Sequence, residues 1–217
     1  MIDGKIVKVC GMRDLDNIRS VITTGVDWVG FIFYPRSSRY VGQEREVLKD
    51  NLQHAGKRIK KVGVFVDATE EQILELVDVC GLDFVQLHGH ESPDMCYSLQ
   101  KRGIALIKAL PVATADDLTN TQAYEGRVDY FLFDTKTENY GGSGQLFDWD
   151  LLSAYQGETP FLLSGGLSPV CLPQLLAFHH PCLAGIDLNS GFEVAPARKD
   201  ADLLHQFITN YKRKYHE

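Results

Sequence analysis

Residues 61–87 read KVGVFVDATEEQILELVDVCGLDFVQL, and this stretch decides the fold. Residues 61–66 form a valine-rich apolar run that is typical of a buried strand. Residues 69–79 carry apolar side chains at helical spacing, and residues 83–87 form a second strand-like run. A strand, an amphipathic helix and another strand in this order predict two parallel strands joined by a right-handed crossover.

The same unit continues toward both ends of the chain. We predict strands at residues 5–10, 28–34, 61–66, 83–87, 104–109, 129–133, 161–163 and 185–188. We predict helices at residues 14–24, 43–54, 69–79, 93–101, 114–124, 149–155, 168–178 and 200–214, and a glycine-rich loop at 135–146. Eight units of about 27 residues predict an α/β fold, a single (β/α)8 TIM barrel that spans residues 1–217 as one domain. The alternative is an open doubly wound sheet, but no glycine-rich dinucleotide-binding fingerprint follows the first strand.

Composition restricts the classes of partner and the compartment. The formal net charge is −7 and the pI is near 5.5, which argues against non-specific nucleic-acid binding. No apolar run approaches the length of a membrane span, and no secretory leader is evident. The five cysteines are an odd number and form no CxxC pair, so we expect free thiols and a cytoplasmic location. His179 and His180 are adjacent and lack further ligands at metal-binding spacing, so no metal site is predicted.

In a barrel of this kind the active site lies in the loops that follow the strands. The polar residues at these positions are Cys10, Arg36, Arg39, Gln86, His88, Asp134, Ser164, Asp187, Asn189 and Ser190. Gly165 and Gly166 let backbone N–H groups approach an anion closely, and the segment at Asn189 and Ser190 can begin a helical turn that faces the same anion. Together the two loops predict a phosphate site.

Each candidate also has a structural interpretation. A cysteine in a strand is more often a small buried residue than a catalyst, although Cys10 at a strand end would face the mouth of the barrel. Asp134 follows an apolar run and needs a partner, which a salt bridge to Lys136 could supply. His88 could simply satisfy a hydrogen bond, and Arg39 could be a solvated surface charge.

Motifs in a fixed order along almost the whole chain resemble those of the phosphoribosylanthranilate isomerase family. They are KVCG at 8–11, GFIFYP at 30–35, SRY at 38–40, VGVFV at 62–66, VQLHG at 85–89, DTK at 134–136, GGSG at 141–144, FDW at 147–149, LSGGL at 163–167 and DLNSG at 187–191. Any one of these motifs is weak evidence, but their combination is specific.

The resemblance implies an Amadori rearrangement of a phosphoribosyl anthranilate in tryptophan biosynthesis, without cofactor or metal. It implies that Cys10 is the general base and Asp134 the general acid, and that Arg39 faces the anthranilate carboxylate. Gln86 and His88 are expected to bind substrate. The phosphate is expected at Gly165, Gly166, Asp187, Asn189 and Ser190. The expected partner is a phosphorylated small molecule, and we favour a monomer.

Two positions depart from the family pattern. Arg13 adds a positive charge that we expect to lie near Cys10 and to favour its thiolate. Asn189 stands where serine is common, so a backbone contact to phosphate is expected in place of a side-chain contact. The alternative functions are another phosphosugar barrel isomerase, which would use carboxylate or lysine–glutamate sets, and a phosphate-binding barrel without catalytic activity.

Overall fold

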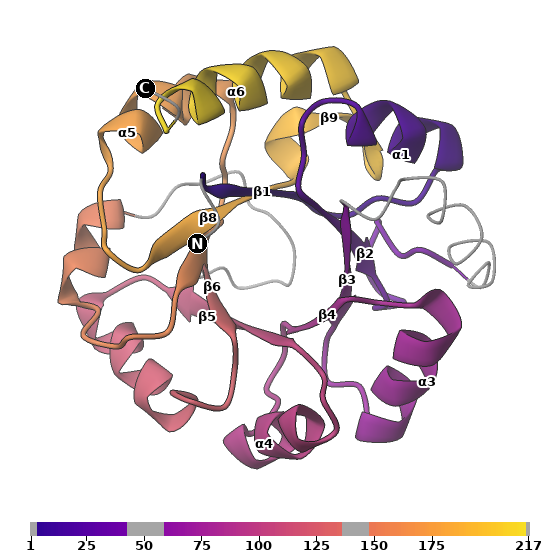
Figure 1. Ribbon diagram of the computed structural model, residues 1–217, viewed down its shortest axis with the longest axis vertical. Coiled ribbons are helices and arrows are strands. Elements are labelled where there is room, and N and C mark those ends of the chain that lie inside the picture. The colour runs from indigo at the N-terminus through magenta and orange to yellow at the C-terminus, as the bar shows by residue number, and fades with distance from the viewer. Residues whose placement is uncertain (1–3, 43–58, 136–147, 216–217) are drawn as a thin grey trace.

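The computed structural model describes residues 4–42, 59–135 and 148–215. Eight parallel strands close into a barrel in the order β1 to β8, with helices around the outside (Figure 1). The strands are β1 (Ile6–Val9), β2 (Trp28–Ile32), β3 (Lys60–Phe65), β4 (Phe84–Leu87), β5 (Leu106–Val112), β6 (Tyr130–Thr135), β7 (Phe161–Leu163) and β8 (Leu183–Leu188). The predicted barrel is confirmed, and β1 pairs with β8 to close it.

The segments between the strands form α-helices and short 3-10 helices, labelled η. They are α1 (Leu15–Ile22), α3 (Glu70–Cys80), α4 (Pro93–Lys101), η1 (Ala115–Ala123), η2 (Trp149–Ala154), η3 (Pro169–Cys171), α5 (Leu172–Ala177), η4 (Ser190–Phe192) and α6 (Ala201–Arg213). The predicted helix at 43–54 and most of the predicted loop at 135–146 lie outside the described residues.

Local sequence explains where these helices begin and end. Thr69 and Gln72 form a capping box at the start of α3, and Gly81 ends that helix in the left-handed conformation, with φ 59°. Pro173 lies in the first turn of α5, where its missing N–H costs nothing. The α-helix predicted at 114–124 is instead the 3-10 helix η1, where the Asp117 carboxylate accepts backbone N–H groups at its start.

Two further features differ from the sequence-based expectation. Strand β5 continues to Val112 through the exposed Pro111, although we expected it to end at residue 109. A small antiparallel hairpin, β9 (Glu193–Ala195) and β10 (Arg198–Lys199), follows β8 and was not predicted. Strands this short give too few residues for a periodic signal.

Two apolar clusters hold the barrel together. The larger one fills the space between the strands and the outer helices, and a smaller one fills the lower barrel interior. In the smaller cluster Trp28 stacks on Phe84 at 4.5 Å and meets Tyr130 edge-on at 5.3 Å. Because this interior is packed with side chains, a ligand site must lie above it, toward the carboxyl ends of the strands.

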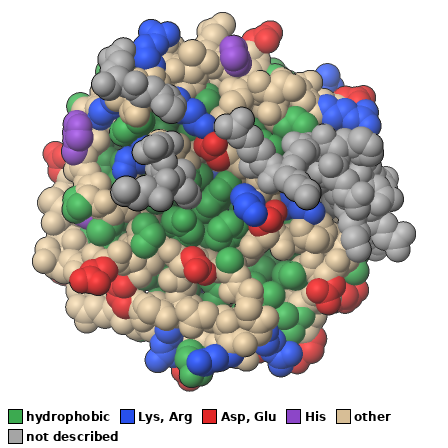
Figure 2. Space-filling view, viewed as in Figure 1, with side chains coloured by type: hydrophobic (Ala, Val, Ile, Leu, Met, Phe, Trp, Pro, Cys, Tyr) green, Lys and Arg blue, Asp and Glu red, His purple; other side chains and the backbone are tan. Residues whose placement is uncertain are grey.

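The surface carries charges of both signs. Viewed along the barrel, hydrophobic side chains gather over its middle, and lysine, arginine and acidic side chains are interspersed around the rim (Figure 2). Of the residues drawn in colour, this face shows no broad basic patch of the kind that binds nucleic acid. No helix among the described residues has the length and apolar character needed to cross a membrane.

Candidate active site

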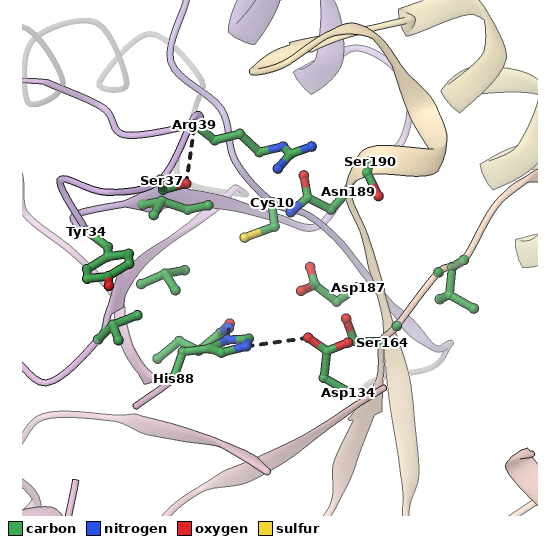
Figure 3. A pocket seen from close by; sticks show the side chains of 17 residues that line it. Cys10, Tyr34, Ser37, Arg39, His88, Asp134, Ser164, Asp187, Asn189 and Ser190 are labelled. Atoms are coloured by element: carbon green, nitrogen blue, oxygen red, sulfur yellow. Dashed lines mark hydrogen bonds and ion pairs between the residues drawn. The ribbon is translucent and has the colours of Figure 1, made fainter. Parts of the chain in front are cut away.

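One pocket at the carboxyl ends of the strands collects every residue that was predicted to have a catalytic or binding role, whereas the candidate Arg36 is exposed and does not line it (Figure 3). Its lining includes Cys10, Arg39, Gln86, His88, Asp134, Gly165, Gly166, Asp187, Asn189 and Ser190. Residues that the sequence did not single out also line it, including Tyr34, Ser37, Val64 and Val66. The pocket therefore combines acid, base and cation groups with a glycine-rich rim.

Cys10 lies immediately after β1 and is 4% exposed. Its backbone N–H donates to the Leu188 carbonyl of β8 at 2.8 Å, which fixes it at the barrel closure. Strand β2 passes so close that a Cβ at Gly30 would lie 2.8 Å from Cys10 Sγ. Glycine at position 30 is thus needed for the thiol to keep its place.

The electrostatic environment of Cys10 differs from the expectation. Burial raises the pKa of the Cys10 thiol, whereas the Lys8 and Lys199 ammonium groups act to lower it. Arg13 is exposed and donates to the Ser38 carbonyl at 3.5 Å. The expectation that Arg13 favours the thiolate is therefore wrong. The cations that do so come from inside the fold.

Asp134 lies near the end of β6, three strands from β1 through β7 and β8. Its Oδ1 accepts the Thr135 backbone N–H at 2.8 Å, and its Oδ2 lies 3.4 Å from His88 Nε2. His88 Nδ1 lies 2.9 Å from Gln86 Nε2 on β4, so this chain of contacts links three of the predicted residues. Lys136, the alternative partner of Asp134, lies outside the described residues.

Arg39 does not point freely into solvent. Its Nε and Nη2 donate to the Glu193 carboxylate at 2.7 to 3.0 Å, and Glu193 Oε1 also accepts from Lys199 Nζ at 2.6 Å. Burial acts to raise the pKa of Glu193, but the two cations outweigh it and hold that pKa below its ordinary value. Nη1 of Arg39 remains available, among the described residues, for another acceptor.

The two predicted phosphate loops lie on the same side of the pocket. Gly165 and Gly166 both have positive φ, 83° and 69°, which favours glycine. A Cβ at Gly165 would lie 2.2 Å from Thr135 Oγ1 and 2.9 Å from Asp134 Oδ1, so this loop packs directly against the acid. The strand-eight loop begins the short helix η4 at Ser190, as predicted.

Asn189 is held by the hairpin that follows it. Its Oδ1 accepts from Lys199 Nζ at 2.7 Å, and the Lys199 side chain is fully buried. This bond fixes the side-chain amide through its oxygen. The expectation that any phosphate contact at this position is made by the backbone stays a prediction.

Asp187 lines the pocket, but its carboxylate is occupied. Oδ1 accepts from Lys8 Nζ at 2.9 Å inside the barrel. A negatively charged side chain repels a phosphate, so the predicted contribution of Asp187 to phosphate binding can only come from its backbone. Figure 3 shows Asp187 between Cys10 and Asp134.

Sequence reasoning missed Lys8, Glu193 and Lys199. Lys8 carried a usable signal, because a lysine inside a strand with no exposed face requires a buried partner. Glu193 and Lys199 carried none, since their contacts to Arg39 and Asn189 depend on how the hairpin folds back.

Among the described residues, no group of three or more histidine, cysteine or acidic side chains could hold a metal ion.

Comparison with known proteins shows the family of this chain. The family model described as N-(5'phosphoribosyl)anthranilate (PRA) isomerase matches residues 7–210. A curated protein of that name from Parabacteroides distasonis is 55% identical over 205 residues, which cover 94% of this chain and 91% of the relative. Another from Phocaeicola vulgatus is 49% identical over 209 residues, covering 96% and 98%.

Solved structures give the same family. The crystal structure of phosphoribosyl anthranilate isomerase from Thermotoga maritima superimposes with a TM-score of 0.85 at 35% identity, covering 96% of this chain and 99% of the other. A phosphoribosyl anthranilate isomerase in complex with reduced 1-(o-carboxyphenylamino)-1-deoxyribulose 5-phosphate has a TM-score of 0.81 at 31% identity, with the same coverage. The chain belongs to the N-(5'-phosphoribosyl)anthranilate isomerase family.

Proposed function

We propose that Cys10 and Asp134 perform the reaction of this isomerase, the conversion of N-(5'-phosphoribosyl)anthranilate into 1-(2-carboxyphenylamino)-1-deoxyribulose 5-phosphate in tryptophan biosynthesis. The observation that carries the assignment is that a thiol and a carboxyl group, contributed by β1 and β6, line one pocket beside a glycine-rich anion loop. The reaction is an Amadori rearrangement, in which an aminoaldose becomes an aminoketose without net oxidation.

The acid step opens the sugar ring. Asp134 in its protonated form gives a proton to the ribose ring oxygen, the bond from that oxygen to C1 breaks, and C1 becomes a Schiff base with the anthranilate nitrogen. The Thr135 N–H and His88 Nε2 hold the Asp134 carboxyl in place. His88 and Gln86 lie at the same wall, and Gln86 Oε1 is buried without a hydrogen-bond partner among the described residues, so it suits a sugar hydroxyl.

The base step transfers hydrogen within the sugar. The Cys10 thiolate takes the proton from C2, and the electrons shift to give an enolamine. The C2 hydroxyl then loses its proton and C1 gains one, which leaves a ketone at C2. The two groups need opposite protonation states at the same time, a general acid and a general base on either side of one substrate.

Charged groups fix the two ends of the substrate. The phosphate binds the backbone N–H groups of Gly165, Gly166 and Ser190, and the anthranilate carboxylate binds Arg39. Glu193 engages one edge of the Arg39 guanidinium and so presents its other edge to the ligand. These contacts orient the sugar between Cys10 and Asp134.

A direct assay tests the function. Purified chain is added to N-(5'-phosphoribosyl)anthranilate, and loss of the substrate fluorescence is followed. Rapid first-order loss that scales with protein concentration is expected. Another phosphosugar isomerase would leave this fluorescence unchanged while acting on a different aldose phosphate, and a binding protein would protect the signal without turnover.

Arg39→Ala is expected to act on binding. The variant loses a charge-assisted hydrogen bond to the anthranilate carboxylate. Because one such bond is worth about 1.5–3 kcal/mol, KM should rise roughly tenfold or more, while kcat should change less. Arg39→Lys keeps the charge without the planar fork, so its KM should lie between those of the unmodified enzyme and Arg39→Ala. Steady-state kinetics check this. An unchanged KM in Arg39→Ala would leave Arg39 with only its structural ion pair to Glu193.

Asn189→Ala is expected to weaken phosphate binding only modestly, because the proposed contact at this position is made by the backbone. Inorganic phosphate as a competitive inhibitor measures this directly, and its inhibition constant should change by less than about tenfold, within one net hydrogen bond. Complete loss of inhibition would show that the side chain itself binds the anion.

Three further expectations accompany this function. We propose that residues 1–217 form one catalytic domain, that the chain is a monomer, and that it acts in the cytoplasm. The free state of all five cysteines supports a reducing compartment. The relative from Thermotoga maritima is described as dimeric, a property of that protein.

A further inference from the structure

A lysine and an aspartate form an ion pair inside the barrel, at the floor of the pocket that the aspartate lines. Lys8 lies in the middle of β1 and Asp187 opposite it on β8, where the two strands pair in register. Their side chains are 0% and 5% exposed, and Lys8 Nζ donates to Asp187 Oδ1 at 2.9 Å. A buried ion pair is an expensive way to stabilise a fold, because an apolar pair of similar volume is often equal or better. Its position therefore calls for a reason other than stability.

Lys8 also meets the catalytic thiol. Lys8 and Cys10 are two residues apart on one strand, so their side chains leave it on the same side. The ammonium donates to Asp187 Oδ1. At Gly30 on the neighbouring strand, a Cβ would lie 3.2 Å from Lys8 Nζ and 2.8 Å from Cys10 Sγ, so these two atoms are at most the sum of the two distances apart. The glycine leaves the space in which thiol and ammonium face each other.

We infer that Lys8 is a positioning residue for the base of the proposed function: its ammonium, held in the barrel by Asp187, stabilises the Cys10 thiolate from below while the substrate occupies the pocket above. Lys8 does not line the pocket, so it does not touch the substrate. The inference rests on the proposed role of Cys10. It adds the group that stabilises the negative charge of the thiolate.

Other charged groups surround the Cys10 sulfur, and they also affect the stability of its thiolate. Those that face Cys10 or the pocket beside it are Lys8, Asp187, Lys199, Arg39, Asp134 and His88, with Glu193 behind Arg39 and Lys199. Lys199 also acts to lower the pKa of Cys10, but more weakly than Lys8, and Glu193 neutralises it. Asp187 acts in the opposite direction and raises the thiol pKa.

Lys8 has to be protonated for this role. Burial acts to lower its pKa, but the carboxylate of Asp187 and the sulfur of Cys10 outweigh burial and raise it above the ordinary lysine value. The ammonium is therefore present at neutral pH. Its charge compensates part of the cost of placing a thiolate in a buried site.

The test is the ultraviolet absorbance of the thiolate as a function of pH, taken as the difference between each protein and its Cys10→Ser counterpart. In Lys8→Met the midpoint of the titration should rise by about one pH unit or more, which means about tenfold less thiolate at any lower pH. In Asp187→Asn the midpoint should fall, because the amide removes a negative charge and can still accept from Lys8. Opposite signs separate an electrostatic role from general damage to the barrel.

Lys108→Met is the matched control. Lys108 is equally buried and paired with Glu91 at 2.9 Å, but its ammonium bonds carbonyls of the β4–α4 loop, away from Cys10. In this variant the midpoint of the Cys10 titration should equal that of the unmodified protein. If Lys8→Met does not fold, as judged by circular dichroism, Asp187→Asn alone decides.

An unchanged midpoint in Lys8→Met, or a rise in Asp187→Asn, would overturn the inference. These titrations need no substrate and no turnover, so they leave the isomerase assignment of Cys10 untouched. That assignment fails by a different result, full activity of Cys10→Ser.

Discussion

Cys10→Ser is expected to lower kcat by about 10³-fold, in the range found for loss of a general acid or base, and to leave KM within a few fold. Serine has nearly the same shape, so the packing against Gly30 and the bond to the Leu188 carbonyl persist. Its hydroxyl is far too weak an acid to supply a base at neutral pH. The fluorescence assay at saturating substrate measures the effect.

Cys182→Ser is the matched control, since Cys182 is half-buried and bonds the Gly157 carbonyl outside the pocket. It should keep the kcat of the unmodified enzyme. If Cys10→Ser also kept its kcat with the same pH profile, Cys10 would be a packing residue and another base would have to be found.

The pH dependence of a variant without the acid gives the sign for the base. Because burial raises the thiol pKa above its ordinary value, most of Cys10 is protonated at neutral pH. In Asp134→Asn, which has no acid proton to lose, residual activity that depends on the thiolate should therefore increase as the pH rises toward that pKa. The double variant Cys10→Ser, Asp134→Asn should lack this increase.

Asp134→Asn is expected to lower kcat by about 10²–10⁴-fold through loss of the general acid. The amide keeps the shape of the carboxyl group, and its oxygen can still accept the Thr135 N–H. It has no acidic proton to give to the ring oxygen, so ring opening slows while phosphate and carboxylate contacts remain. KM should change much less than kcat, which single-turnover measurements can confirm.

Asp202→Asn, at an exposed position in the first turn of α6, controls for the loss of one negative charge and should have full activity. A large rise in KM with unchanged kcat for Asp134→Asn would show that Asp134 binds substrate without transferring a proton. In that case His88, which lies 3.4 Å from it, would be the next acid to test.

Much of this architecture could be predicted because its signals are local. Buried parallel strands are continuous apolar runs, and the predicted barrel strands correspond to those observed, with no end shifted by more than three residues. The positions of Cys10, Asp134 and the two glycines follow from the rule that polar residues after barrel strands face one mouth. All of them line the observed pocket.

What could not be predicted depends on contacts between distant parts of the chain. Arg39 and Glu193 are separated by 154 positions in the sequence. They meet only because the hairpin at 193–199 folds over the loop that follows β2. Proximity in the sequence predicts that Arg13 supplies the positive charge near Cys10. The direction in which each side chain points determines which cation does so. Lys8 leaves β1 on the same side as Cys10, and Arg13 leaves the following loop toward solvent.

A crystal structure of this chain with reduced 1-(o-carboxyphenylamino)-1-deoxyribulose 5-phosphate tests the central claim most directly. We predict the sugar C2 at about 3–3.5 Å from Cys10 Sγ, a near-attack separation. The phosphate should lie at Gly165, Gly166 and Ser190, with the ligand carboxylate on Arg39. A ligand whose phosphate lies elsewhere in the mouth, or whose C2 is out of reach of both Cys10 and Asp134, would contradict the account.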